Sequence, residues 1–243
     1  MTSSWATPFF TGKTVLLTGG TGGIGLGLAT AFRDAGATVH ATGATDAEVA
    51  SAEIAAEGIA FSTLDVRSDE AVRACAARFD RLDVLVNCAG VNLRAAEFTP
   101  EGFSTVLDIN LSGSMRAAMA FRSKLAGGAI LNIASMFAFF GAPHAPAYAA
   151  SKGGVAQLTK SLAIAFAAEN IRVNALAPGW IETPMTAAPR ANPERNAELV
   201  GRTPMGRWGT PADLAGPALF LCSPLAGFVT GAILPVDGGF LVA

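Results

Sequence analysis

Short apolar runs alternate with longer amphipathic segments along the chain. The runs are almost continuously apolar, as strands buried on both faces are, and we predict strands at Thr14–Leu17, Thr38–Ala41, Ala60–Leu64, Val84–Val86, Ala129–Ile133, Arg172–Ala175 and Ala232–Val236. Helices are predicted between them at Ile24–Asp34, Asp46–Glu57, Asp69–Phe79, Pro100–Leu125, Ala147–Glu169 and Pro211–Cys222. Such alternation is typical of parallel strands joined by right-handed crossovers. We therefore predict an α/β fold in which helices flank a seven-stranded parallel sheet.

No change of composition divides the chain, so residues 1–243 are expected to form a single domain. Residues 183–209 differ from the rest because they are rich in Pro, Arg and Met and too long for an ordinary connection. We interpret this segment as a lid over a site. The helices predicted at Pro100–Leu125 and Ala147–Glu169 are apolar on more than one face, so we expect them to contact another subunit.

Composition limits the possible partners and compartments. The chain carries 17 Lys+Arg and 19 Asp+Glu, a net charge of −2, which gives no basic surface for nucleic acid or an anionic membrane. No apolar run reaches the ~18 residues of a membrane span, and the N-terminus does not resemble a signal peptide. Cys75, Cys88 and Cys222 form neither a metal-ligand pattern nor a disulfide framework, which favours the cytoplasm. We predict no metal, because His40 and His144 lack partners at metal-ligand spacing; His40 is expected in the core or on a sheet face.

The first predicted strand runs directly into a glycine-rich turn that opens a helix. The turn reads Thr18-Gly19-Gly20-Thr21-Gly22-Gly23-Ile24-Gly25. Glycines at such a junction let the backbone approach a pyrophosphate, and the helix N-terminus supplies unpaired N–H groups. Because the turn stands at the first strand–helix junction of an alternating chain, we predict a doubly wound, Rossmann-type domain that binds a dinucleotide.

The end of the second strand is where such a fold reads the adenosine ribose. Residues 39–45 (VHATGAT) offer no acidic residue for a 2′-hydroxyl and no Arg or Lys for a 2′-phosphate. The choice between NAD and NADP stays open, with a slight preference for NAD because a 2′-phosphate without a cation is costly. Asp46 or the hydroxyls of Thr42 and Thr45 are candidate ribose partners. Asp65, followed by Val66, is a candidate acceptor for the adenine amino group.

Tyr148 is the only tyrosine of the chain and stands four residues before Lys152. Residues at this spacing share a helix face, so we expect the ammonium to lower the phenol pKa from about 10 and to make it a general base. Ser135 follows the strand Ala129–Ile133 and should lie at the same sheet edge as the glycine turn. The alternative is a core tyrosine with a satisfied hydroxyl. The combination favours a proton-transfer site.

These motifs resemble those of the classical short-chain dehydrogenases/reductases. The similarity runs from Gly12 to Gly239, and its further motifs are Asn87-Cys88-Ala89-Gly90, Asn110, Asn174, Pro178-Gly179 with Thr183, and Val236-Asp237-Gly238-Gly239. The family usually has a second Asn where Cys88 stands, and the small thiol is expected to substitute without disturbing catalysis. The resemblance implies an NAD(P)-dependent alcohol dehydrogenase or ketone reductase, a homotetramer whose one domain binds the dinucleotide and performs catalysis.

The resemblance also implies residue roles. Tyr148 would exchange a proton with the substrate oxygen, Lys152 would lower the pKa of Tyr148 and hold the nicotinamide ribose, Ser135 would hydrogen-bond the substrate oxygen, and Asn110 would hold a relay water. The implied cofactor contacts are Gly19, Thr21, Gly23, Ile24, Gly25, Thr42, Gly43, Asp65, Val66, Asn87, Ala89, Gly90, Tyr148, Lys152, Pro178, Gly179, Ile181 and Thr183.

The loop Gly90–Arg94 resembles that of polyol and sugar-acid dehydrogenases of the family, so we expect a small hydroxy or keto compound as substrate. Arg94 is the candidate partner of a carboxylate, and Phe137, His144 and Trp180 are further candidate substrate contacts. Three alternatives stay open: a 3-oxoacyl thioester reductase of the same family, a dinucleotide sensor without turnover, and a dehalogenase. The intact glycines argue against the dehalogenase, and the intact Tyr148 and Lys152 argue against the sensor.

Overall fold

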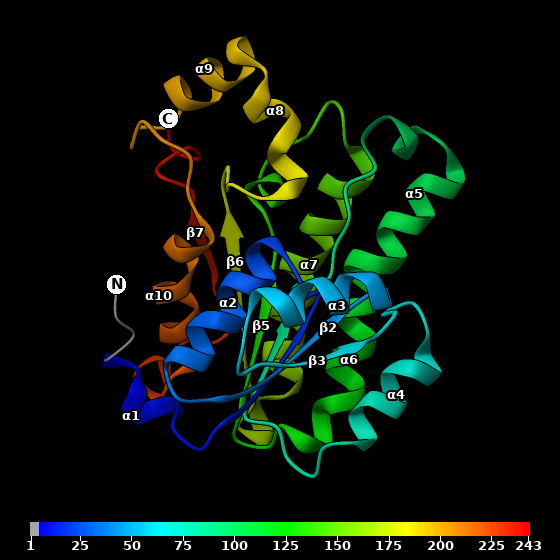
Figure 1. The fold of residues 1–243 in the computed structure, drawn as a ribbon, viewed down its shortest axis with the longest axis vertical. Helices are drawn as coiled ribbons and strands as arrows, with labels where there is room; N and C mark the ends of the chain where they lie inside the picture. Colours follow the sequence, from blue (N-terminus) through cyan, green and yellow to red (C-terminus); the bar gives the residue numbers. More distant parts are fainter. Residues whose placement is uncertain (1–4) are drawn as a thin grey trace.

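A parallel sheet runs through the middle of the molecule, with helices on both faces (Figure 1). The computed structural model describes residues 5–243. The seven strands are ordered β3-β2-β1-β4-β5-β6-β7, and all their pairings are parallel. Their bounds are β1 Thr14–Thr18, β2 Thr38–Gly43, β3 Ala60–Thr63, β4 Val84–Asn87, β5 Ala129–Ile133, β6 Arg172–Pro178 and β7 Ile233–Val236. This order confirms the predicted fold, and the winding reverses between β1 and β4, where such sheets bind ligands.

Several strands end later than the apolar pattern predicted. Thr18 and Asn87 each continue a strand past its last apolar residue, and β6 runs three residues further than predicted, through Leu176 and Ala177 to Pro178. Backbone pairing does not require an apolar side chain, as the parallel register of Thr18 with Asn87 shows. Thr18 and Asn87 bring polar side chains to the carboxyl edge of the sheet.

The predicted helices occur in the predicted order, two of them with corrected bounds, and three further helices, Thr7–Phe10, Ala187–Ala191 and Pro193–Arg202, were not predicted. The longer helices are α2 Gly23–Asp34, α3 Asp46–Ala55, α4 Asp69–Ala77, α5 Pro100–Leu107, α6 Gly113–Phe121, α7 Pro146–Ala165, α9 Pro193–Arg202 and α10 Pro211–Cys222, and the short ones are α1 Thr7–Phe10 and α8 Ala187–Ala191. The single helix predicted over Pro100–Leu125 is wrong, because a π-helical turn at Asp108–Ser112 separates α5 from α6. The helix predicted to reach Glu169 ends at Ala165, and a 3-10 turn follows.

Two hydrophobic cores lie on opposite faces of the sheet. On β1, Val15 and Leu17 pack into the core beneath α2 and α10, whereas Leu16 packs into the core beneath α4, α6 and α7. Successive side chains of a strand point to opposite faces, so a strand buried on both faces must be apolar at every position. This explains the continuous apolar runs in the sequence.

The segment 183–209 leaves the sheet and returns to it. It contains α8 and α9, which lie beyond the carboxyl ends of the strands (Figure 1). Its base is fixed by a bridge between Ile181 and Gly209, with Glu182 N donating to Gly209 O at 2.9 Å and Gly209 N donating to Trp180 O at 2.9 Å. None of the helices in residues 5–243 is long and apolar enough to cross a membrane.

Candidate active site

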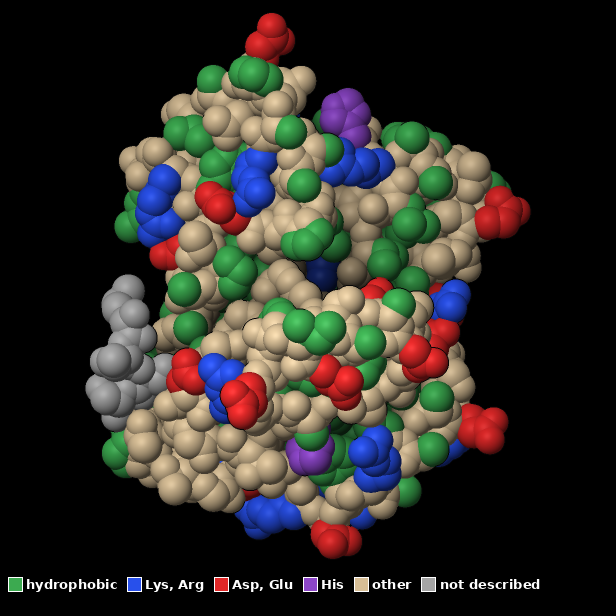
Figure 2. All heavy atoms as spheres, viewed as in Figure 1, with side chains coloured by type: hydrophobic (Ala, Val, Ile, Leu, Met, Phe, Trp, Pro, Cys, Tyr) green, Lys and Arg blue, Asp and Glu red, His purple; other side chains and the backbone are tan. Residues whose placement is uncertain are grey.

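A pocket of about 880 Å³ opens at the carboxyl edge of the sheet, where the winding reverses. The face that holds it is visibly hollowed between its upper and lower parts (Figure 2). Its volume lies in the range of small-molecule and cofactor sites. Twelve of the predicted cofactor contacts line it, namely Gly19, Thr21, Gly23, Ile24, Gly25, Asp65, Val66, Ala89, Gly90, Tyr148, Lys152 and Thr183.

Close backbone packing explains the glycine turn. A Cβ on Gly25 would lie 2.0 Å from the carbonyl oxygen of Gly19, and a Cβ on Gly19 would lie 2.5 Å from Cα of Ala89. Gly19 also has a φ of 64°, which L side chains rarely adopt. The start of α2 can therefore approach β1 and β4 closely, with its N–H groups at the pocket.

Six predicted cofactor contacts do not line the pocket: Thr42, Gly43, Asn87, Pro178, Gly179 and Ile181. Thr42 is buried, and its hydroxyl has no hydrogen-bond partner within residues 5–243. Asn87 donates to Asn132 Oδ1 at 2.9 Å and lies inside the sheet. These two side chains face the interior because side chains alternate along a strand.

Tyr148 and Lys152 line the pocket, and Ser135, which does not line it, is a hydrogen-bond partner of Tyr148. Tyr148 lies in the first turn of α7, and Ser135 follows β5 directly. Lys152 Nζ donates to the carbonyl oxygen of Ile133 at 2.7 Å and lies 5.5 Å from the centroid of the Tyr148 ring. A phenol, a hydroxyl and an amine at one site can bind a substrate oxygen and move its proton.

The expected low pKa of Tyr148 is wrong for the chain without a cofactor. Burial raises the pKa of Tyr148 to about 12, and the Ser135 side chain opposes this as a hydrogen-bond partner. Burial also lowers the pKa of Lys152 to about 8. Desolvation disfavours the charged form of both groups, and the spacing of two residues on a helix does not reveal it.

Asn110 lies in the π-helical turn between α5 and α6 and is buried. Its Oδ1 accepts a hydrogen bond from Val91 N at 2.8 Å, and its Nδ2 donates to Val91 O and to Ser151 Oγ, each at 3.0 Å. A π-helical turn inside a helix often marks a functional site. The side chain of Asn110 joins the loop after β4 to α7.

Glu97 is a buried carboxylate that sequence reasoning missed. Its oxygens accept from the backbone N–H groups of Leu93 at 2.9 Å, Arg94 at 3.2 Å and Tyr148 at 2.9 Å. It therefore fixes the first turn of α7 relative to the loop after β4. A single acidic residue with distant backbone partners leaves no pattern in a sequence.

The four candidate substrate contacts lie outside the pocket lining. Arg94 donates from Nη2 to the carbonyl oxygen of Met185 at 3.2 Å, and so reaches the segment 183–209. Phe137 packs against Tyr148 and Trp180, with ring centroids 6.2 and 6.1 Å apart. His144 is exposed. Phe137 thus packs beside the phenol, and Trp180 packs against Phe137.

Two further titratable side chains have no place in proton transfer. His40 is half-buried on β2 and packs edge-on against Phe79, with ring centroids 4.9 Å apart. Burial raises the pKa of the Cys88 thiol to about 11, so this pocket-lining group is uncharged at neutral pH. Residues 5–243 bring no three His, Cys, Asp or Glu side chains into an arrangement that could hold a metal ion.

A glycine turn and a phenol and amine that line one pocket, with a hydroxyl beside the phenol, are typical of a dinucleotide-dependent oxidoreductase. Comparisons agree. Residues 19–241 match the family model described as enoyl-(acyl carrier protein) reductase. A 2-dehydro-3-deoxy-D-gluconate 5-dehydrogenase from Bacillus subtilis (strain 168) is 42% identical over 241 residues, covering 95% of this chain and 95% of that protein. A 3-oxoacyl-(acyl-carrier-protein) reductase FabG from Chlamydia pneumoniae is 38% identical over 244 residues, covering 94% and 96%.

Solved structures give the same result. The gluconate 5-dehydrogenase from Burkholderia cenocepacia J2315, in complex with NADP and tartrate, is 33% identical with a TM-score of 0.89, covering 97% of this chain and 97% of that chain. The chain belongs to the short-chain dehydrogenase/reductase family. It is an NAD(P)-dependent oxidoreductase that acts on a hydroxyl or keto group.

Proposed function

We propose that this enzyme interconverts a secondary alcohol and a ketone in a sugar acid or a related small hydroxy acid. The observation that carries the proposal is the pocket itself, because one cavity is lined by the glycine turn, by Asp65 and by the pair Tyr148 and Lys152. When bound, the nicotinamide accepts a hydride from the carbon that bears the hydroxyl, or returns it to a carbonyl carbon.

The chain's own residues would bind the coenzyme and move the proton. The start of α2 holds the pyrophosphate, Asp65 and Val66 lie where the adenine is expected, and Lys152 holds the nicotinamide ribose. Ser135 orients the substrate oxygen towards Tyr148 Oη. In oxidation Tyr148 Oη takes the hydroxyl proton, and in reduction it supplies that proton. The positive charge of an oxidised nicotinamide would favour the phenolate and offset the effect of burial.

The conformation of Arg94 supports the proposal that the substrate carries a carboxylate. Its backbone has a φ of 52°, a strained value for a side chain of this size, and Glu97 and Asn92 both accept from its N–H. Strain of this kind persists where the surroundings hold a residue in place, often at a ligand site. The tartrate of the solved relative is likewise a hydroxy acid.

A panel of substrates tests this proposal. We expect coenzyme reduction with sugar acids, and we expect Arg94→Ala to raise KM at least tenfold for a carboxylate substrate, because a charge-assisted hydrogen bond is worth about 1.5–3 kcal/mol. A neutral polyol provides the control. If Arg94 only fixes the segment 183–209 through Met185, the variant will raise KM equally for the neutral and the acidic substrate, and the proposed role is wrong.

A second candidate function is reduction of a 3-oxoacyl thioester. It is favoured by the description of the family model and by the relative from Chlamydia pneumoniae. The same panel separates the two functions, since turnover of an acetoacetyl thioester without turnover of any sugar acid would favour the second. Tyr148, Ser135 and Lys152 would have the same roles in both.

We also propose a homotetramer in the cytoplasm. Met115 and Met119 of α6 are 37% and 45% exposed, and Leu225 and Phe228 after α10 are also exposed. Clustered apolar side chains on a surface are typical of subunit contacts. Cys75, Cys88 and Cys222 are all free thiols, which suits a reducing compartment.

A further inference from the structure

The residues at the end of the second strand do not decide between NAD and NADP. A residue of α3, Glu48, is a candidate for the group that makes this choice. In a doubly wound sheet the adenosine lies over the strands on the far side of the switch point from the catalytic helix. Here that end of the pocket is formed by the β2–α3 turn and by the residues after β3, which include Asp65 and Arg67. Glu48, in the first turn of α3, is part of this wall.

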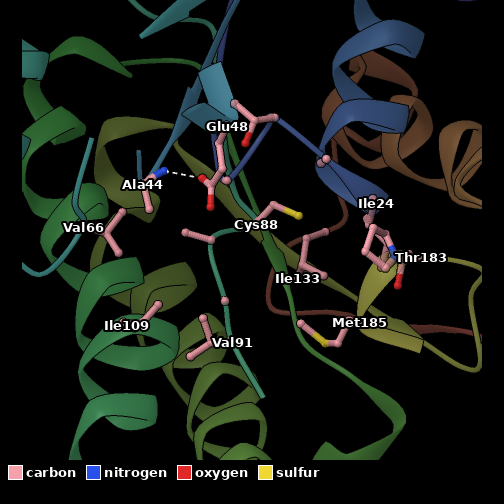
Figure 3. Close-up of a pocket in the computed structure, with 18 of the residues that line it drawn as sticks. Ile24, Ala44, Glu48, Val66, Cys88, Val91, Ile109, Ile133, Thr183 and Met185 are labelled. Atoms are coloured by element: carbon pink, nitrogen blue, oxygen red, sulfur yellow. Dashed lines mark hydrogen bonds between the residues drawn. The ribbon is translucent and has the colours of Figure 1, made fainter. Parts of the chain in front are cut away.

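The Glu48 carboxylate is held in a defined position. Ala44 N donates to Glu48 Oε2 at 2.7 Å, and Figure 3 shows this bond on the opposite side of the pocket from Ile24 and Thr183. A Cβ on Gly43 would lie 3.1 Å from Glu48 Oε2 and 2.7 Å from Thr21 Cγ2. The absence of a side chain at Gly43 therefore lets the carboxylate lie beside the glycine turn.

The other ribose candidates of this region are less available. Thr42 is buried, and neither Thr42 nor Asp46 lines the pocket. Thr45 lines it, but its Oγ1 accepts from Glu48 N at 3.2 Å. Glu48 Oε1 makes no hydrogen bond within residues 5–243, so it remains able to accept one from a ligand hydroxyl.

The local charge is unfavourable for a phosphate. Arg67 lines this end of the pocket, but its guanidinium is bound to both oxygens of Asp65, with Nε 3.0 Å from each and Nη2 2.7 Å from Oδ2. The Ala44 N–H, at a helix start where an anion could otherwise bind, is taken by Glu48. A 2′-phosphate would therefore meet a carboxylate and no free cation along this stretch of the described chain.

We propose that Glu48 selects NAD(H) over NADP(H), accepting a hydrogen bond from the adenosine 2′-hydroxyl and repelling a 2′-phosphate. The acidic group usually supplied at the strand end would come here from the first turn of the following helix. The inference rests on the proposed function, because it requires that the pocket bind a nicotinamide dinucleotide.

The test is a titration of the purified protein with NADH and with NADPH, followed by nicotinamide fluorescence. We expect NADH to bind at least tenfold more tightly, a difference of about 1.4 kcal/mol. Glu48→Gln keeps an acceptor for Ala44 N but removes the charge, and should reduce this ratio about tenfold, mainly by tightening NADPH. The matched control is Glu53→Gln, which removes the same charge from an exposed position of α3 that does not line the pocket, and should leave the ratio unchanged.

The other possible results of the titration would each overturn a stated claim. The inference about Glu48 would be overturned if the unaltered protein bound NADPH as tightly as NADH or more tightly. It would also be overturned if Glu48→Gln left the ratio of the two affinities unchanged. Neither result would affect the proposed function. An equal effect of Glu53→Gln would show that net charge matters and the position of Glu48 does not, and would also overturn the inference. If neither coenzyme binds, the proposed function itself fails.

Discussion

Replacing Tyr148 with Phe is expected to lower kcat about 10³-fold, or about 4 kcal/mol of transition-state stabilisation. The variant removes only the phenolic oxygen, so the ring can still pack against Phe137 and lie beneath Lys152. Coenzyme binding should therefore change less than threefold. The measurement is steady-state turnover of the best substrate together with a coenzyme titration.

Phe139→Ala provides the control for this variant. Phe139 lies between Ser135 and Tyr148 and is 48% exposed. We expect its replacement to leave kcat within about twofold, because exposed side chains away from a site contribute little. A Tyr148→Phe enzyme that kept more than a tenth of its kcat would show that another group moves the proton.

Gly25→Ala should abolish coenzyme binding, with Kd raised more than 100-fold. An added Cβ would lie 2.0 Å from the Gly19 carbonyl oxygen and 3.0 Å from Gly20 Cα, both backbone atoms of the glycine turn. Neither can move without displacing the N–H groups that are to face the pyrophosphate. Calorimetric titration with NADH measures the loss.

Gly216→Ala is the matched control, since Gly216 also lies in a helix and an added Cβ would meet nothing within 4 Å. We expect normal coenzyme affinity and equal or slightly greater stability, because Ala is the better helix former. If Gly25→Ala bound NADH with a Kd within threefold of that of the unaltered protein, the pyrophosphate would have to bind elsewhere.

The sequence revealed the parts of the site that local patterns encode. The glycine turn, the spacing of Tyr148 and Lys152 and the position of Ser135 after a strand depend on neighbours in the chain. The structure brings the first two to one pocket and Ser135 to the side of Tyr148. The seven-stranded parallel sheet followed from the alternation of apolar runs and helices together with the family resemblance.

What the sequence could not reveal depends on tertiary surroundings. Glu48 and Glu97 are defined by the backbone N–H groups that they accept from, and nothing in their neighbours marks them. The interior position of Thr42 follows from which face of β2 it occupies. The predicted direction of the pKa shift of Tyr148 was wrong. The sequence shows the spacing of Tyr148 and Lys152, but it does not show the burial that raises the pKa.

The most direct test of the account is an ultraviolet titration of the single tyrosine, with and without oxidised coenzyme. A free phenol is about three-quarters ionised at pH 10.5, given its reference pKa of about 10. Burial raises the pKa of Tyr148 to about 12, so the folded chain alone should show almost no tyrosinate absorbance at that pH. Bound oxidised coenzyme places a positive charge in the pocket and should lower the pKa, so that tyrosinate appears below pH 10. An ionisation that is the same with and without coenzyme would contradict the assignment of Tyr148 as the proton-transferring group.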